Sequence, residues 1–185
     1  WVLFYAAAGG VGLIAGQWGA SLGARMIGVA GGPEKCELAQ KNGYQICLDR
    51  NSDADVSAKV SELTDGKGAD VIYDPVGGDV FDQSIRCINW GGRLLIVGFA
   101  SGRIPTASIN MPLIKGFSII GVRAGEYARK DPPRGKENNE AIRKLAEEGH
   151  LKPYVCKEFS LEEAKDSILF LSERKLVGKV AVVMN

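Results

Sequence analysis

Residues 1–12 read W-V-L-F-Y-A-A-A-G-G-V-G, and an apolar helical pattern continues from there to about residue 22. An apolar run, a glycine-rich turn and a helix in this order predict a strand, turn and helix that bind a dinucleotide. Backbone N–H groups and the positive end of the helix dipole converge on the pyrophosphate in such a unit. Because a buried strand begins the chain and no methionine precedes it, we expect this sequence to be part of a longer protein.

The turn fits the pattern G-x-G-x-x-G, with Ala7 in place of the first glycine. In this alignment Gly9 lets the backbone approach the pyrophosphate, and Gly12 permits close packing of the helix on the strand. The cofactor-binding residues expected in the turn are therefore Ala8, Gly9, Gly10, Val11 and Gly12.

Strand-like and helical patterns alternate along the first two thirds of the chain. Strands are expected at residues 1–5, 25–30, 45–48, 70–74, 93–97 and 117–122, and helices at residues 10–22, 33–41, 54–63 and 80–87. This alternation predicts an α/β fold: a doubly wound, Rossmann-type parallel sheet with helices on both faces. The ligand of such a sheet lies at the carboxyl ends of the strands.

The pattern changes after residue 123, and the sequence predicts a boundary there. Residues 1–123 form the expected dinucleotide-binding domain, and residues 124–185 form a C-terminal return segment. Within that segment, residues 128–135 (A-R-K-D-P-P-R-G) are expected to be irregular because of their prolines and glycine. A helix near residues 138–148, an extended run at 154–159, a helix at 161–174 and a strand at 179–183 should follow.

Composition excludes several functions. The formal net charge is +1 and the charges form no basic block, so we expect neither a nucleic-acid nor a membrane partner. Four scattered cysteines and one histidine match no zinc-site spacing, so no metal is expected. Free thiols and the absence of a long apolar run predict a cytoplasmic protein. No G-x-S-x-G or P-loop motif supports acyl or phosphoryl transfer.

The end of the second predicted strand favours NADPH over NADH. An NAD-binding site carries an acidic residue there, roughly 20 residues after the turn, to bind the ribose 2′-hydroxyl. This chain has Gly31 and Gly32 instead. Lys35 and Arg50 are cations that could pair with a 2′-phosphate, although each would be an ordinary surface residue in isolation.

Two further strand ends supply the rim of the expected cleft. The segments D-P-V-G-G at residues 74–78 and G-F-A-S-G at residues 98–102 have turn-forming composition. Asp74 either caps its turn or faces the ligand, and no residue of the rim is an evident catalytic acid or base. The cofactor-binding residues expected here and at the second strand end are Gly31, Val76, Gly98, Phe99 and Ser101.

Several of these segments together resemble one family. The turn at residues 6–12, Y-D-P-V-G-G at 73–78, G-G-R-L at 91–94, V-G-F-A-S-G at 97–102 and a closing R…G-K-V at 174–180 are similar to the quinone oxidoreductase (zeta-crystallin-like) branch of the medium-chain dehydrogenase/reductase superfamily. The resemblance covers nearly the whole chain. It implies zinc-free, NADPH-dependent reduction of quinones or α,β-unsaturated carbonyl compounds by a dimeric enzyme.

The resemblance also assigns roles to particular residues. It implies that Lys35 contacts the 2′-phosphate and that Arg174 reaches back toward the cofactor phosphates. Arg50 stands where the family usually has a tyrosine, so that contact departs from the pattern. The family's N-terminal GroES-like domain, to which residues 124–185 would return, is not in this sequence. Since the family's polar active-site residues lie largely in that domain, the catalytic residues are unknown.

Two alternatives remain open from the sequence. Zeta-crystallin-like proteins include non-catalytic members with structural or RNA-binding roles, although the near-zero charge disfavours RNA. The chain could also be the enoyl-reductase module of a larger synthase, which shares the same sheet.

Overall fold

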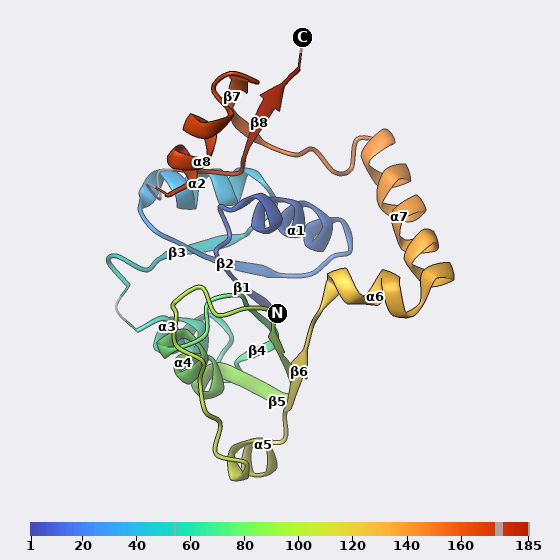
Figure 1. Cartoon of the computed structure of the whole chain (residues 1–185). Coiled ribbons are helices and arrows are strands. Elements are labelled where there is room, and N and C mark those ends of the chain that lie inside the picture. Colours follow the sequence, from blue (N-terminus) through green and yellow to red (C-terminus); the bar gives the residue numbers. More distant parts are fainter. Residues whose placement is uncertain (54, 173–175, 185) are drawn as a thin grey trace.

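The computed structural model describes residues 1–53, 55–172 and 176–184 (Figure 1). Its centre is a six-stranded sheet in the order β3-β2-β1-β4-β5-β6, in which every neighbouring pair is parallel. The predicted doubly wound fold is confirmed. The first three strands are added outward from β1 on one side, and the chain then returns to the other side of β1 to form β4, β5 and β6. The strands are β1 (Val2–Tyr5), β2 (Met26–Ala30), β3 (Ile46–Asp49), β4 (Ala69–Asp74), β5 (Ile88–Ile96) and β6 (Ser118–Gly121).

Helices cover both faces of this sheet because successive strand residues point to opposite sides. In β1, Leu3 packs with residues of α3 and α4, whereas its neighbour Phe4 packs with residues of α1 and α2. All five residues of β2 are buried, as a central parallel strand requires. The helices are α1 (Gly10–Ser21), α2 (Pro33–Lys41), α3 (Val56–Leu63) and α4 (Asp79–Cys87), and a short α5 (Asn110–Lys115) that the sequence did not predict.

The return segment contains more helix than expected. Its elements are α6 (Ala124–Lys130), α7 (Pro132–Glu147), β7 (Val155–Ser160), α8 (Ala164–Ser172) and β8 (Lys179–Val183). The prediction that residues 128–135 are irregular was wrong. Asp131 accepts a hydrogen bond from the backbone N of Arg134 and caps α7. Pro132 and Pro133 follow the cap in the first turn of the helix. Backbone N–H groups have no acceptor within the helix at these positions, so the N–H that proline lacks costs no hydrogen bond.

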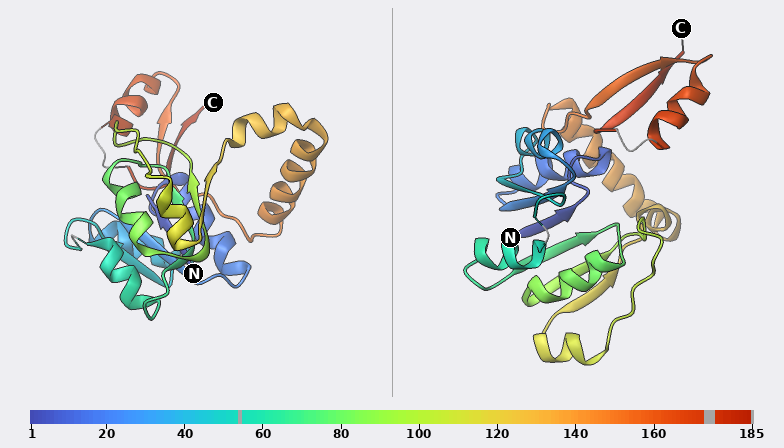
Figure 2. Two further views of the ribbon diagram at one scale, coloured as in Figure 1. Left: turned by 90° about the horizontal axis from the view of Figure 1, so that it is seen from below. Right: turned by 90° about the vertical axis from the view of Figure 1, so that its left-hand side faces the viewer.

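Strands β7 and β8 pair in parallel as a separate two-stranded sheet, and with α8 they form a lobe at one end of the molecule (Figure 2). This lobe contacts the glycine-rich turn, because the backbone N of Gly178 donates to the carbonyl of Ala8 at 2.8 Å. Gln17 of α1 also binds the backbone of Lys152, donating to its carbonyl and accepting from its N–H. Helices α6 and α7 project to one side of the sheet (Figure 1).

None of the helices in the described ranges combines the length and apolar character that a membrane span requires.

Candidate dinucleotide-binding cleft

The turn between β1 and α1 is shaped by close backbone contacts. A Cβ on Gly12 would lie 2.4 Å from the carbonyl oxygens of Ala6 and Ala7, so only glycine allows α1 to start this near the strand. The buried hydroxyl of Tyr44 donates to the Gly12 carbonyl at 2.7 Å and fixes the helix from its other side. Gly9 is the N-cap, and neither a capping side chain nor an acidic residue of the first turn competes for the first N–H groups. These donors therefore suit an anion.

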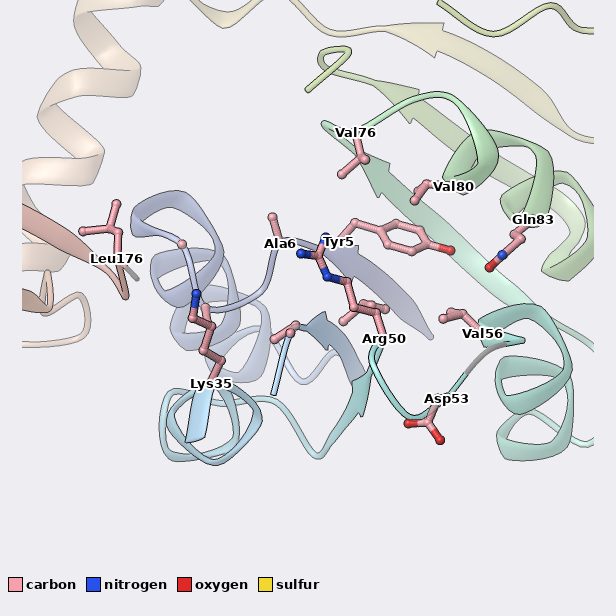
Figure 3. Close-up of a pocket in the computed structure, with 15 residues that line it drawn as sticks. Tyr5, Ala6, Lys35, Arg50, Asp53, Val56, Val76, Val80, Gln83 and Leu176 are labelled. Atoms are coloured by element: carbon pink, nitrogen blue, oxygen red, sulfur yellow. The ribbon is translucent and has the colours of Figure 1, made fainter. Parts of the chain in front are cut away.

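Beside this turn lies a cavity of about 310 Å³ at the carboxyl ends of the central strands (Figure 3). Six of the predicted cofactor-binding residues line it: Ala8, Gly9, Gly31, Lys35, Arg50 and Val76. Residues that the sequence did not single out also line it, namely Tyr5, Ala6, Val29, Ala30, Asp53, Val56, Val80, Gln83 and Leu176.

The other predicted site residues lie elsewhere around the cleft. Gly10 lies against the side chain of Lys179 from β8, and Val11 is 61% exposed at the start of α1. Gly12 is buried against β1 and serves packing. Arg174 lies outside the described residues.

The predicted rim residues Gly98, Phe99 and Ser101 belong to a loop that is joined to the loop after β4. The backbone N of Ser101 donates to the Val76 carbonyl at 2.9 Å. A Cβ on Gly77 would lie 2.9 Å from a ring carbon of Phe99, and Gly77 has φ +68°, so glycine is needed there. The two loops form one wall, on which Phe99 is 41% exposed.

Two cations approach the cleft from neighbouring strand ends. Lys35 lies in the first turn of α2, and Arg50 follows β3 with its Nε 3.1 Å from where a Cβ on Gly31 would be. In Figure 3 the side chains of Lys35 and Arg50 extend in the same direction, whereas the carboxylate of Asp53 points the opposite way. Both predicted phosphate partners therefore line the site, Lys35 from the start of α2 and Arg50 from the turn after β3.

Sequence reasoning missed the role of Asp49 at the end of β3. Its Oδ1 accepts hydrogen bonds from the backbone N of Gly32 at 2.7 Å and of Asn51 at 3.0 Å. These bonds hold the pKa of Asp49 below its usual range. The available signal was an acidic residue ending the strand that neighbours the Gly31-Gly32 pair.

Asp74 is the buried carboxylate of the rim. Its Oδ1 accepts from the backbone N of Val76 and of Gly77, each at 2.8 Å, so it caps the turn after β4. Oδ2 has no hydrogen-bond partner within the described ranges. Burial raises the pKa of Asp74, and this outweighs the two N–H bonds that lower it. Asp74 therefore has a structural place in the site.

The titratable side chains that line the described part of the cleft are Tyr5, Lys35, Arg50 and Asp53, and their geometry assigns no catalytic acid or base. Tyr5 lines the cavity with its ring, and burial raises the pKa of its phenol further above the usual value. Across the described ranges no three His, Cys, Asp or Glu side chains lie close enough together to hold a metal ion.

Comparison with known proteins gives the same family throughout. A family model described as zinc-binding dehydrogenase matches residues 10–147. The quinone oxidoreductase-like protein 2 homolog of Nematostella vectensis is 38% identical over 183 residues, which are 98% of this chain and 50% of the relative. The 2-haloacrylate reductase of a Burkholderia species is 30% identical over 184 residues, 99% of this chain and 55% of the relative.

Among solved structures, Escherichia coli quinone oxidoreductase complexed with NADPH is similar to this chain with a TM-score of 0.87 at 30% identity. The match covers 98% of this chain and 56% of that one. This chain spans about half the length of the curated relatives it matches. Sequence and fold agree over almost all of its residues, and so the chain belongs to the quinone oxidoreductase branch of the medium-chain dehydrogenase/reductase superfamily.

Proposed function

We propose that this chain binds NADPH in the cleft and forms the cofactor-binding half of an enzyme that reduces quinones or α,β-unsaturated carbonyl compounds. The observation that carries the proposal is that Lys35 and Arg50 both line the cleft together with Gly31 at the end of β2, and that Arg50 lies against Gly31. In dinucleotide-binding folds the ribose 2′ position lies at this strand end. Two cations there favour a 2′-phosphate, which NADH lacks.

The residues present fit this cofactor. The uncapped N–H groups at the start of α1 suit the pyrophosphate, and Gly9 lets it approach the backbone. Asp74 holds the turn that presents Val76 to the cavity. When bound, NADPH supplies a hydride from its nicotinamide ring, while the residues of this chain bind and orient it.

The substrate class is proposed from the relatives. Proteins similar to this chain are named as quinone oxidoreductases and a 2-haloacrylate reductase. We assign no catalytic residue, and we propose zinc-independent reduction on the strength of the resemblance to the zeta-crystallin-like branch.

The proposed enzyme is a cytoplasmic homodimer. The strand β6 ends the sheet, pairs only with β5 among the described strands, and has all four residues exposed. An unpaired apolar edge is a surface on which a second copy can continue the sheet. The described cysteines Cys36, Cys47, Cys87 and Cys156 are free, which fits a reducing compartment.

Calorimetric titration of the wild-type chain with NADPH and NADH tests the cofactor assignment. We expect tighter binding of NADPH, and we expect Lys35→Ala to weaken NADPH by about 1–2 kcal/mol, because this half-buried cation makes a partly screened charge-assisted contact. NADH should be unaffected. Lys67→Ala removes an exposed lysine of the loop that precedes β4 and serves as the control. Equal affinity of the wild type for both cofactors would contradict the proposal.

A further inference from the structure

A single carboxylate oxygen joins the loop that leads into α2, the helix of Lys35, to the turn that carries Arg50. Oδ1 of Asp49 accepts from the backbone N of Gly32, which lies 17 residues earlier in the loop between β2 and α2. The same oxygen accepts from the backbone N of Asn51 and closes the turn after β3. Each loop is therefore fixed relative to the other through one side chain.

The atoms that Asp49 holds determine where the cations stand. Gly32 is the N-cap of α2, with φ +95°, and Lys35 lies in the first turn of that helix. Arg50 lies between Asp49 and Asn51, and its side chain rests against Gly31. A shift of the Gly32 N–H or of the Asn51 N–H would therefore change the spacing of Lys35 and Arg50.

Backbone pairing does not supply this connection. The register of β2 and β3 ends at Ala30 opposite Asp49, and the backbone N of Arg50 donates to the Ala30 carbonyl at 2.9 Å as the last bond between them. Beyond that point the two segments separate into loops. The Asp49 side chain continues the link past the end of the sheet.

We infer that Asp49 is a positioning residue that sets the preference for a 2′-phosphate by holding the loop that leads to Lys35 and the turn that carries Arg50 in a fixed arrangement. This inference rests on the proposed binding of NADPH. The Asp49 carboxylate, which interacts with Arg50, also opposes an incoming phosphate through its charge. The hydrogen bonds that Asp49 accepts therefore raise the affinity for a 2′-phosphate, whereas its negative charge lowers it. Substitutions can separate these two effects.

Asp49→Asn and Asp49→Ala separate these effects because both remove the charge. Asparagine keeps an oxygen that can accept from Gly32 and Asn51, whereas alanine has none. We expect Asp49→Asn to bind NADPH and adenosine 2′-monophosphate at least as tightly as the wild type. Asp49→Ala should bind both about three- to ten-fold more weakly than Asp49→Asn, the range for a partly exposed charge-assisted contact that is misplaced. Binding of NADH should differ by less than about two-fold between the two variants, since NADH has no group for these cations.

Asp55 offers a matched control. Its Oδ1 accepts from the Ser57 hydroxyl at 2.6 Å and from the backbone N of Ala58 at 3.0 Å, so one carboxylate oxygen again takes two hydrogen bonds, but at the start of α3 and outside the cavity lining. Asp55→Asn and Asp55→Ala should therefore show the same ratio of NADPH to NADH affinity. Calorimetric titration gives the dissociation constants, and thermal unfolding without ligand shows that each variant is folded.

The outcomes are distinguishable. Equal affinities of Asp49→Asn and Asp49→Ala for adenosine 2′-monophosphate would overturn the inference while leaving NADPH binding intact. A wild-type chain that binds neither NADPH nor the 2′-phosphate probe would overturn the proposed function, and this inference with it. If Asp49→Ala does not fold, Asp49→Glu keeps the charge and displaces the acceptor. Weaker binding of the probe to Asp49→Glu than to the wild type would support the inference, and unchanged binding would overturn it.

Discussion

At the scale of single residues, Asp74 is a buried carboxyl group whose charged form is disfavoured by burial. It is 1% exposed, and only one of its oxygens accepts hydrogen bonds from the described residues. Burial raises its pKa above the value in the unfolded chain, which is about 4. From that pH upward the folded chain holds the proton more tightly than the unfolded chain. Its contribution to the free energy of unfolding therefore falls as the pH rises, until the folded state has lost the proton.

Asp74→Asn removes this dependence. Urea unfolding at several pH values from 4 to 8 should show the variant gaining stability relative to the wild type as the pH increases. A gain of about 1 kcal/mol would move the melting temperature by 2–4 °C in a chain of this size. Asp65→Asn, at an exposed loop position, should follow the wild-type profile. A constant difference between Asp74→Asn and the wild type across this range would contradict the prediction.

The residues of the site were predictable from the sequence where local backbone geometry decides them. The turn around Gly9 and Gly12 is one continuous segment. Its sequence motif alone therefore predicts the close backbone packing that the structure shows. The role of Asp49 could not be predicted in the same way. Its bond to Gly32 depends on the lateral register of β2 and β3, which the order of residues along the chain does not specify.

At the scale of elements, β6 is an edge strand that pairs on one side only, with β5, among the described strands. Ile119 is 37% exposed and Ile120 is 38% exposed, although both belong to an apolar strand. We expect the edge to pair with β6 of a second copy, so that sedimentation at micromolar concentration shows a dimer. Ile119→Lys should shift the equilibrium to monomer, because it places a like charge twice in one symmetric interface. The exposed Ile168 of α8 gives a control, since Ile168→Lys should leave the dimer unchanged.

A monomer in the wild type, or a dimer that Ile119→Lys does not weaken, would contradict this pairing.

The elements also show where sequence patterns succeed and fail. The apolar pattern identified five strands of the central sheet to within one residue at either end, although β6 is exposed. It missed the first part of β5, which begins at Ile88 rather than at residue 93. The segment at residues 128–135 failed because prolines were interpreted as breaking a helix. In the structure Asp131 supplies the cap that lets Pro132 begin one.

At the scale of the whole molecule, the lobe of β7, α8 and β8 is held to the nucleotide-binding sheet at the glycine-rich turn. Gly178 has φ +66°, and a Cβ there would lie 2.4 Å from the carbonyl oxygen of Tyr154, so glycine is required at the contact. Other parts of the lobe remain uncovered: Ile168 is 66% exposed and Leu169 is 51% exposed. We expect this apolar surface to pack against the domain that the sequence resemblance implies.

The final prediction concerns turnover by residues 1–185 alone. The phosphate-binding groups arise from local structure, namely the start of α1 and the ends of β2 and β3, so we expect this chain to bind NADPH, although weakly.

Hydride transfer demands more, because an acceptor must be held about 3–3.5 Å from the nicotinamide with water excluded. The rim at Phe99 and the start of α1 at Val11 are both open to solvent in the described part of the chain. We therefore expect no measurable oxidation of NADPH with a small quinone, and we expect activity when an N-terminal domain of the family precedes residue 1. Turnover by the 185-residue chain within about tenfold of that longer protein, which is about 1.4 kcal/mol in barrier height, would place the whole active site within these residues.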